Sequence, residues 1–141
     1  MKYLIDTCIL SELIKKKPDQ NVESWFYSQN EDSLYISVIS FGELRKGISK
    51  LTDNSNKKVK LLDWVGGLEK RFLGRIIDIS LDVAENWGHI QGELEKKGKT
   101  LPIIDALIAC TAITHTMIAV TRNTKDMARS GVELINPFDV L

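Results

Sequence analysis

The sequence predicts an α/β protein with a mainly parallel sheet, on three observations. Five short apolar runs are spaced along the 141 residues, and helical patterns fill the gaps between them. The runs are nearly continuous rather than alternating, as expected for strands covered on both faces. Strands that alternate with helices indicate parallel pairing. With 43% hydrophobic and 27% charged residues, we expect one globular domain over residues 1–141.

The elements follow from local patterns. The expected strands are residues 2–5, 34–38, 75–79, 117–121 and 133–135. The expected helices cover about 9–17, 23–29, a segment from about Ser40, 58–73, a segment after Ser80, and 102–114. Pro18 should stop the first helix. In the fifth helix, Val83, Trp87 and Ile90 recur at helical spacing and predict a buried stripe.

Composition excludes several classes of protein. No apolar run approaches the ~20 residues that span a bilayer, so no membrane segment is expected. An acidic residue already stands at position 6, where a signal peptide would need a longer apolar stretch, so a cytoplasmic protein is expected. The 19 basic and 19 acidic residues balance, which gives no overall basic footprint for nucleic acid. If bound metal neutralised four of the acids, the rest of the chain would carry a net positive charge, so a polyanionic substrate is not excluded.

A metal site, if present, should use oxygen ligands. The chain has two cysteines and two histidines, and these four residues are too scattered for a zinc signature. Carboxylate oxygens favour Mg²⁺ or Mn²⁺.

Three acids should meet at one edge of the predicted sheet. Asp6 ends the first strand, Glu43 lies in the first turn of the helix after the second strand, and Asp126 lies in the loop after the fourth strand. Ligands of such sheets bind beyond the carboxyl ends of the strands. We therefore expect these three side chains to reach a common site.

Asp105 is the only charged residue in the segment 101–113. The helix that contains it leads directly into the fourth strand, so the start of that helix should lie at the same edge of the sheet. An unpaired carboxylate in apolar surroundings is costly or protonates. A bound dication would remove that cost.

Each acid also has a structural alternative. Asp6 could cap the helix that follows it. Ser40 and Glu43 match the S-x-x-E capping box, which would give Glu43 a purely structural role. Asp105 suits the positive end of a helix dipole. Asp126, in a polar loop, could be an ordinary turn residue.

The motifs resemble a known family as a set. They are residues 3–7, 37–47, 101–109 and 120–126, together with Asn136-Pro137-Phe138 near the end. In order and spacing these segments resemble PIN domains, and most closely the VapC and FitB branch of toxin–antitoxin systems.

The resemblance implies a three-layer α/β/α sandwich and an Mg²⁺- or Mn²⁺-dependent endoribonuclease. It implies that Asp6, Glu43, Asp105 and Asp126 form an acidic quartet that binds metal. Asp6 and Asp105 would be its shared ligands, and a metal-activated water would attack phosphorus.

The resemblance also implies supporting roles for Thr7 and Asn123. Many members have Asn where this chain has Cys8, so a polar helper at that position is in question. The fourth acid is the most variable part of the family pattern, so Asn123 could share the role of Asp126.

Partners follow from the same resemblance. It implies an RNA substrate, a homodimer and an antitoxin whose tail covers the acidic groove, with DNA contacted only through the antitoxin. Four basic residues flank the acids in sequence and could hold phosphate oxygens: Arg45, Lys46, Arg122 and Lys125. The alternative is a weakly catalytic or non-catalytic binding module within an antitoxin–DNA repressor complex.

Overall fold

A computed structural model describes residues 1–139 of the chain. The strands are β1 (Tyr3–Ile5), β2 (Leu34–Ser37), β3 (Ile76–Ile77), β4 (Ile118–Val120) and β5 (Leu134–Ile135). They form one sheet in the order β3-β2-β1-β4-β5, and every neighbouring pair is parallel. All five predicted strands are confirmed, each one to three residues shorter than expected.

Seven α-helices surround the sheet in the described residues. They are α1 (Thr7–Leu13), α2 (Gln20–Ser28), α3 (Val38–Ser49), α4 (Asn56–Arg71), α5 (Leu81–Lys96), α6 (Ile103–Thr114) and α7 (Thr124–Met127), with single 3₁₀ turns at Glu31–Ser33 and Ala128–Ser130. The six predicted helices are confirmed, whereas α7 and the two 3₁₀ turns were not predicted. None of the helices described over residues 1–139 has the length and apolar character needed to cross a bilayer.

Side-chain capping explains where the predicted boundaries were wrong. Asp6 caps α1, which starts two residues earlier than expected. The same helix ends at Leu13 because Glu12 accepts hydrogen bonds from Lys15 Nζ (2.8 Å) and the Asp19 amide (2.9 Å), which turn the chain. Asp19 then accepts from two amides at the start of α2 and so begins that helix three residues early.

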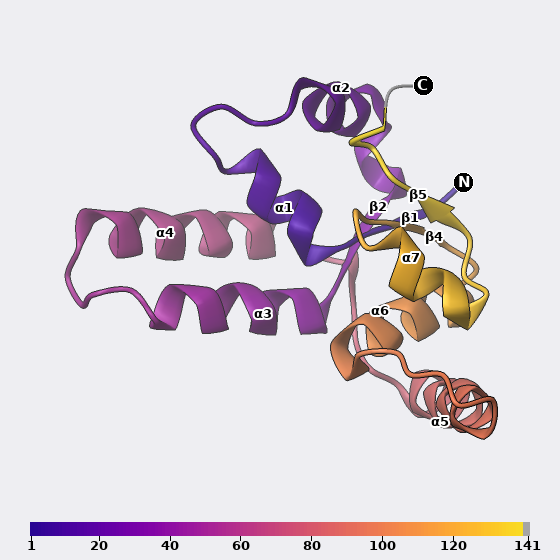
Figure 1. Ribbon diagram of the computed structural model, residues 1–141. Coiled ribbons are helices and arrows are strands. Elements are labelled where there is room, and N and C mark those ends of the chain that lie inside the picture. The colour runs from indigo at the N-terminus through magenta and orange to yellow at the C-terminus, as the bar shows by residue number, and fades with distance from the viewer. Residues whose placement is uncertain (140–141) are drawn as a thin grey trace.

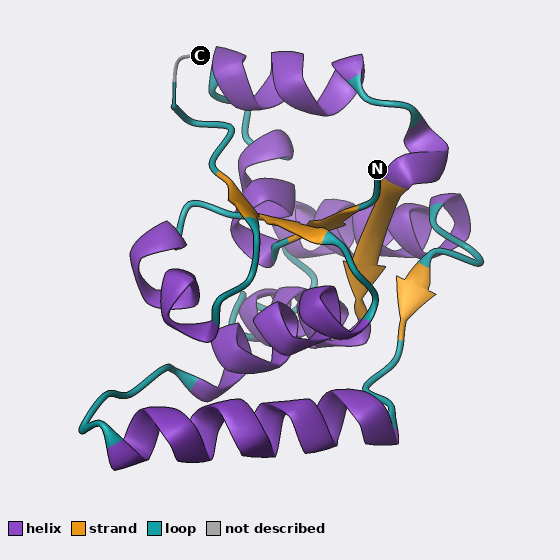
Figure 2. Ribbon diagram, turned by 90° about the vertical axis from the view of Figure 1, so that its right-hand side faces the viewer, coloured by secondary structure: helices purple, strands orange, loops and turns teal. Residues whose placement is uncertain are grey.

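Alternate strand residues divide the core between the two faces of the sheet. Ile5, Ile36 and Val120 pack with residues of α1 to α4. Leu4 and Ala119 point the other way and pack with α6. In Figure 1, α1, α3 and α4 accordingly lie to the left of the strands and α5 and α6 below them, and Figure 2 shows the strands between helical layers. The three-layer sandwich is thus confirmed.

The order of the strands determines where the site forms. Because β1 is central, its carboxyl end lies between those of β2 and β4. Ile5 is in register with Val120, so the next residues, Asp6 and Thr121, are neighbours although 115 positions separate them. The Asp6 amide donates to the Val120 carbonyl (2.9 Å), which fixes this juxtaposition.

Candidate active site

Asp6 is a buried carboxylate at the carboxyl end of β1. Its side chain is held at both oxygens: Oδ1 accepts from the Thr7 amide (2.7 Å) and Oδ2 from the Thr121 hydroxyl (2.6 Å). Asp6 therefore does cap α1, and only 3% of its surface is exposed. Burial raises the pKa of Asp6, although the two hydrogen bonds act in the opposite direction. The capping role therefore does not remove the cost of this buried charge.

Glu43 lies in the second turn of α3, not the first. The cap of α3 is Ser37, whose hydroxyl accepts from the Ile39 amide (3.1 Å). The capping-box interpretation of Ser40 and Glu43 is therefore wrong, because the helix begins three residues earlier. Glu43 Oε1 instead accepts from the Thr7 hydroxyl (2.6 Å), and Ser40 Oγ lies 2.9 Å from that hydroxyl.

Asp105 lies in the first turn of α6 and is half-buried. Its pKa is raised to about 6, mainly by burial and then by the negative charges of Asp6, Glu43 and Asp126, in that order. Asn123 opposes the shift through a side-chain hydrogen bond. Asp105 therefore lies near three acids from other elements, as expected, and its role as a metal ligand stays a prediction.

Asp126 is partly exposed, as are Glu43 and Asp105, whereas Asp6 is buried. It belongs to α7 rather than to a loop, and its side chain is 43% exposed. Arg129 Nη1 lies 3.8 Å from its carboxylate. No salt bridge involves Asp6, Glu43 or Asp105 within residues 1–139. Arg129 thus pairs with Asp126, while the other three carboxylates have no salt-bridge partner in the described residues.

The four basic residues expected to hold phosphate are exposed. Arg45 and Lys46 lie on α3 beyond Glu43, and Lys125 lies on α7. Arg122 has its guanidinium 3.8 Å from the centre of the Phe138 ring, a cation–π contact that orients it toward the C-terminal segment. A phosphate role for these residues stays a prediction.

Sequence reasoning missed the contribution of Thr121. Its hydroxyl donates to Asp6 and accepts from the Asn123 amide (2.9 Å), so it joins two parts of the site. Cys8, where many family members have Asn, also belongs here: its Sγ lies 3.6 Å from Asp6 Oδ2 and 3.6 Å from Thr121 Oγ1. Burial and the Asp6 charge raise the pKa of Cys8, so its thiol stays neutral. The sequence did hold a signal for Thr121, because it is a polar residue at the end of an apolar strand, where it could lie beside Asp6.

Comparison with known proteins identifies the family. The PIN domain family model matches residues 3–131. The chain belongs to the PIN domain family.

Its relatives include the VapC ribonuclease Y4jK of Sinorhizobium fredii, 29% identical over 96% of this chain and 97% of the relative. Toxin FitB of Neisseria gonorrhoeae is 30% identical over 96% of this chain and 97% of that protein. A solved structure described as FitAB bound to an IR36 DNA fragment matches with a TM-score of 0.92 and 30% identity, covering 99% of this chain and 97% of the other.

The donor set of this PIN domain suits a hard divalent cation. All four acids offer oxygen, and Asp6, Glu43 and Asp105 have no salt-bridge partner within residues 1–139. Within residues 1–139, no group of three or more His, Cys, Asp or Glu side chains is already arranged to hold one ion. Mg²⁺ commonly retains several waters and uses only one or two carboxylates, so the residues fit such an ion without a preformed cage.

The contact between Thr7 and Glu43 can be tested directly in this PIN domain. Thr7→Val removes the hydroxyl that donates to Glu43. We expect this change to lower the nuclease rate about tenfold, the effect typical of losing a contact to a metal ligand, which is the role predicted for Glu43. Thr7→Ser keeps the hydroxyl and serves as the control. The measurement is the steady-state nuclease rate of both variants. Equal rates for the Val and Ser variants would mean that the function of Glu43 does not require the Thr7 hydroxyl.

Proposed function

We propose that this chain is a metal-dependent endoribonuclease toxin of a toxin–antitoxin pair. The observation that carries the proposal is the convergence of Asp6, Glu43 and Asp126 on the half-buried Asp105, whose pKa is raised by burial and by their charges. Neighbouring like charges destabilise a fold, so such groups of acids are found mainly at functional sites. Relatives named as VapC ribonucleases and as toxin FitB support the choice of RNA and the role as a toxin.

Asp6 and Asp105 would be the central ligands of Mg²⁺ or Mn²⁺, with Glu43 and Asp126 completing the ligand set or orienting water. Divalent ions in such sites activate water and neutralise charge on the phosphate during phosphodiester hydrolysis. Thr121 and the Thr7 amide fix the two oxygens of Asp6, so this carboxylate needs no rearrangement when substrate arrives. The Thr7 hydroxyl does the same for Glu43, and Asn123 supports Asp105.

The test measures RNA cleavage by the purified protein with and without a divalent metal ion. We expect cleavage with Mg²⁺ or Mn²⁺, loss of cleavage on chelation with EDTA, and recovery when excess Mn²⁺ is added. The Asp105→Asn protein, purified in parallel, controls for contaminating nucleases. Cleavage that persists in EDTA, or that the Asp105→Asn protein retains, would contradict the proposal.

Partners are part of the same proposal. The structural match to FitAB bound to DNA supports an antitoxin partner, with DNA contacted through that partner rather than by this chain. A homodimer and action in the cytoplasm, where RNA substrates are found, complete the proposal. The alternative of a binding module without nuclease activity would show as antitoxin-dependent DNA binding together with absence of cleavage in the same preparations.

A further inference from the structure

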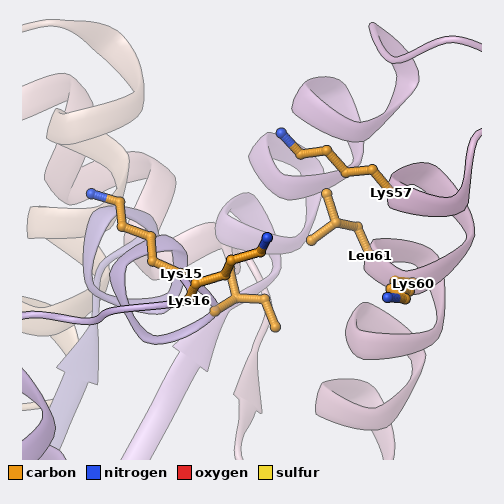
Figure 3. A pocket seen from close by; sticks show the side chains of 6 residues that line it. Lys15, Lys16, Lys57, Lys60 and Leu61 are labelled. Carbon is orange, nitrogen blue, oxygen red and sulfur yellow. The ribbon is translucent and has the colours of Figure 1, made fainter.

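A groove lined by lysines lies beside the acidic site. It has a volume of about 750 Å³ and runs between the turn that follows α1 and the first turns of α4. Its lining residues are Ile14, Lys15, Lys16, Lys57, Lys60 and Leu61, and we call it the lysine groove. Figure 3 shows Lys16 and Lys57 extending from its two sides.

The lysine groove continues into the acidic site. A second cavity of about 280 Å³ shares Ile14, Lys57 and Leu61 with it and is also lined by Thr7 and Glu43. Thr7 and Glu43 are the hydrogen-bonded pair at the edge of the acid cluster. The lysine groove and the acid cluster are therefore adjacent, because the second cavity shares part of its lining with each of them.

The stability of the fold does not account for these lysines. Lys57 lies in the first turn of α4, where the helix dipole disfavours positive charge, and Lys60 lies in the next turn. Lys58, between them, is different: it donates to Asp53 Oδ1 (2.6 Å) and the Leu51 carbonyl (3.4 Å) and so ties down the preceding loop.

Most of the groove lysines also form no salt bridge in the described residues. Within residues 1–139, no salt bridge involves Lys16, Lys57 or Lys60, and only Lys15 is paired, with Glu12. The chain has no net charge, so this local excess of positive charge is not a property of the whole surface.

We propose that the lysine groove binds the phosphate backbone of the RNA substrate and leads the strand to the Thr7–Glu43 side of the acid cluster. The inference rests on the proposed function for its choice of polyanion. Lysines act as point charges toward phosphates, whatever the base sequence. The groove would thus supply affinity for RNA, while the carboxylates carry out cleavage.

The test measures RNA binding by the triple variant Lys16→Gln/Lys57→Gln/Lys60→Gln. The Asp105→Asn background prevents cleavage, and a labelled single-stranded RNA of mixed sequence is the probe. The matched control, Lys70→Gln/Lys97→Gln/Lys99→Gln on the same background, removes equal charge outside the groove.

Each phosphate contact contributes about −0.7 to the slope of log K against log salt for single-strand binding. We therefore expect this slope to become less negative by about 2 in the triple variant. Its affinity should fall at least about tenfold in low salt, while the control keeps both the affinity and the slope.

An affinity and salt slope equal to those of the control would overturn the inference. Lost binding of poly-glutamate by the same variant would in that case assign the groove to an acidic protein segment instead. Failure of the proposed function is distinguishable from this, because that failure appears as absence of cleavage by the wild-type chain in Mn²⁺, whatever the lysine variants do.

Discussion

Asp105→Asn is expected to abolish RNA cleavage and, at the same time, to stabilise the metal-free protein. Changes to residues that only support metal ligands commonly cost 10–100-fold, so loss of a central carboxylate should lower the cleavage rate more than about 100-fold. The gain in stability has a separate cause. Burial and the charges of Asp6, Glu43 and Asp126 make the ionised Asp105 side chain unfavourable in the fold, and asparagine carries no charge.

The pH dependence of this gain follows from the direction of the shift. The pKa of Asp105 is about 6 in the fold, above its ordinary value of 3.8. The destabilisation is therefore absent below about pH 4, grows as pH rises, and is complete above about pH 6. Because solvent screens this partly exposed group, we expect about 1 kcal/mol in the free energy of unfolding at neutral pH.

Denaturant unfolding in EDTA, repeated across this pH range, measures the effect. Asp63→Asn, an exposed charge removal within α4, is the control and should change stability little at any pH. Added Mn²⁺ should stabilise the wild type more than Asp105→Asn. If Asp105→Asn were less stable than the wild type at neutral pH in EDTA, the ionised Asp105 carboxylate would not be destabilising the metal-free fold, and the prediction would be wrong.

The sequence was sufficient for the fold and for the edge at which the acids meet, because both depend on strong, local signals. Continuous apolar runs indicated strands covered on both faces, and the strand ends then placed Asp6. The single charge in the apolar helix α6 marked Asp105. These inferences needed only periodicity and the general position of ligands in parallel sheets.

Other features depended on contacts that a linear pattern does not contain. Ser37 and Ser40 both precede plausible helix starts, and only the geometry of α3 shows that Ser37 caps it and that Glu43 is free to accept from Thr7. The role of Thr121 depends on the register between β1 and β4. The lysine groove joins residues after α1 to residues of α4, more than 40 positions apart.

Thr121→Val is expected to weaken both the activity and the fold. The hydroxyl of Thr121 donates to Asp6 Oδ2 and accepts from the Asn123 amide, and valine offers neither interaction at nearly the same volume. An unsatisfied buried group costs about 1–3 kcal/mol, so the free energy of unfolding should fall by about that amount. Cleavage should fall about 10–100-fold, because Asp6 loses its orientation and Asn123, which supports Asp105, loses its anchor.

The direction of the pKa change separates this role from general destabilisation. Burial already raises the pKa of Asp6, and the Thr121 hydrogen bond lowers it, so Thr121→Val should raise it further. A raised carboxyl pKa destabilises the fold at pH values above it, so the loss of stability should be larger at alkaline than at acidic pH. The acidic limb of the pH–rate profile should move to higher pH in the same variant, whereas Thr121→Ser, which keeps the hydroxyl, should retain the wild-type profile. A merely structural role for Thr121 would lower the rate of the valine variant equally at every pH, since the protonation of Asp6 would then be unchanged.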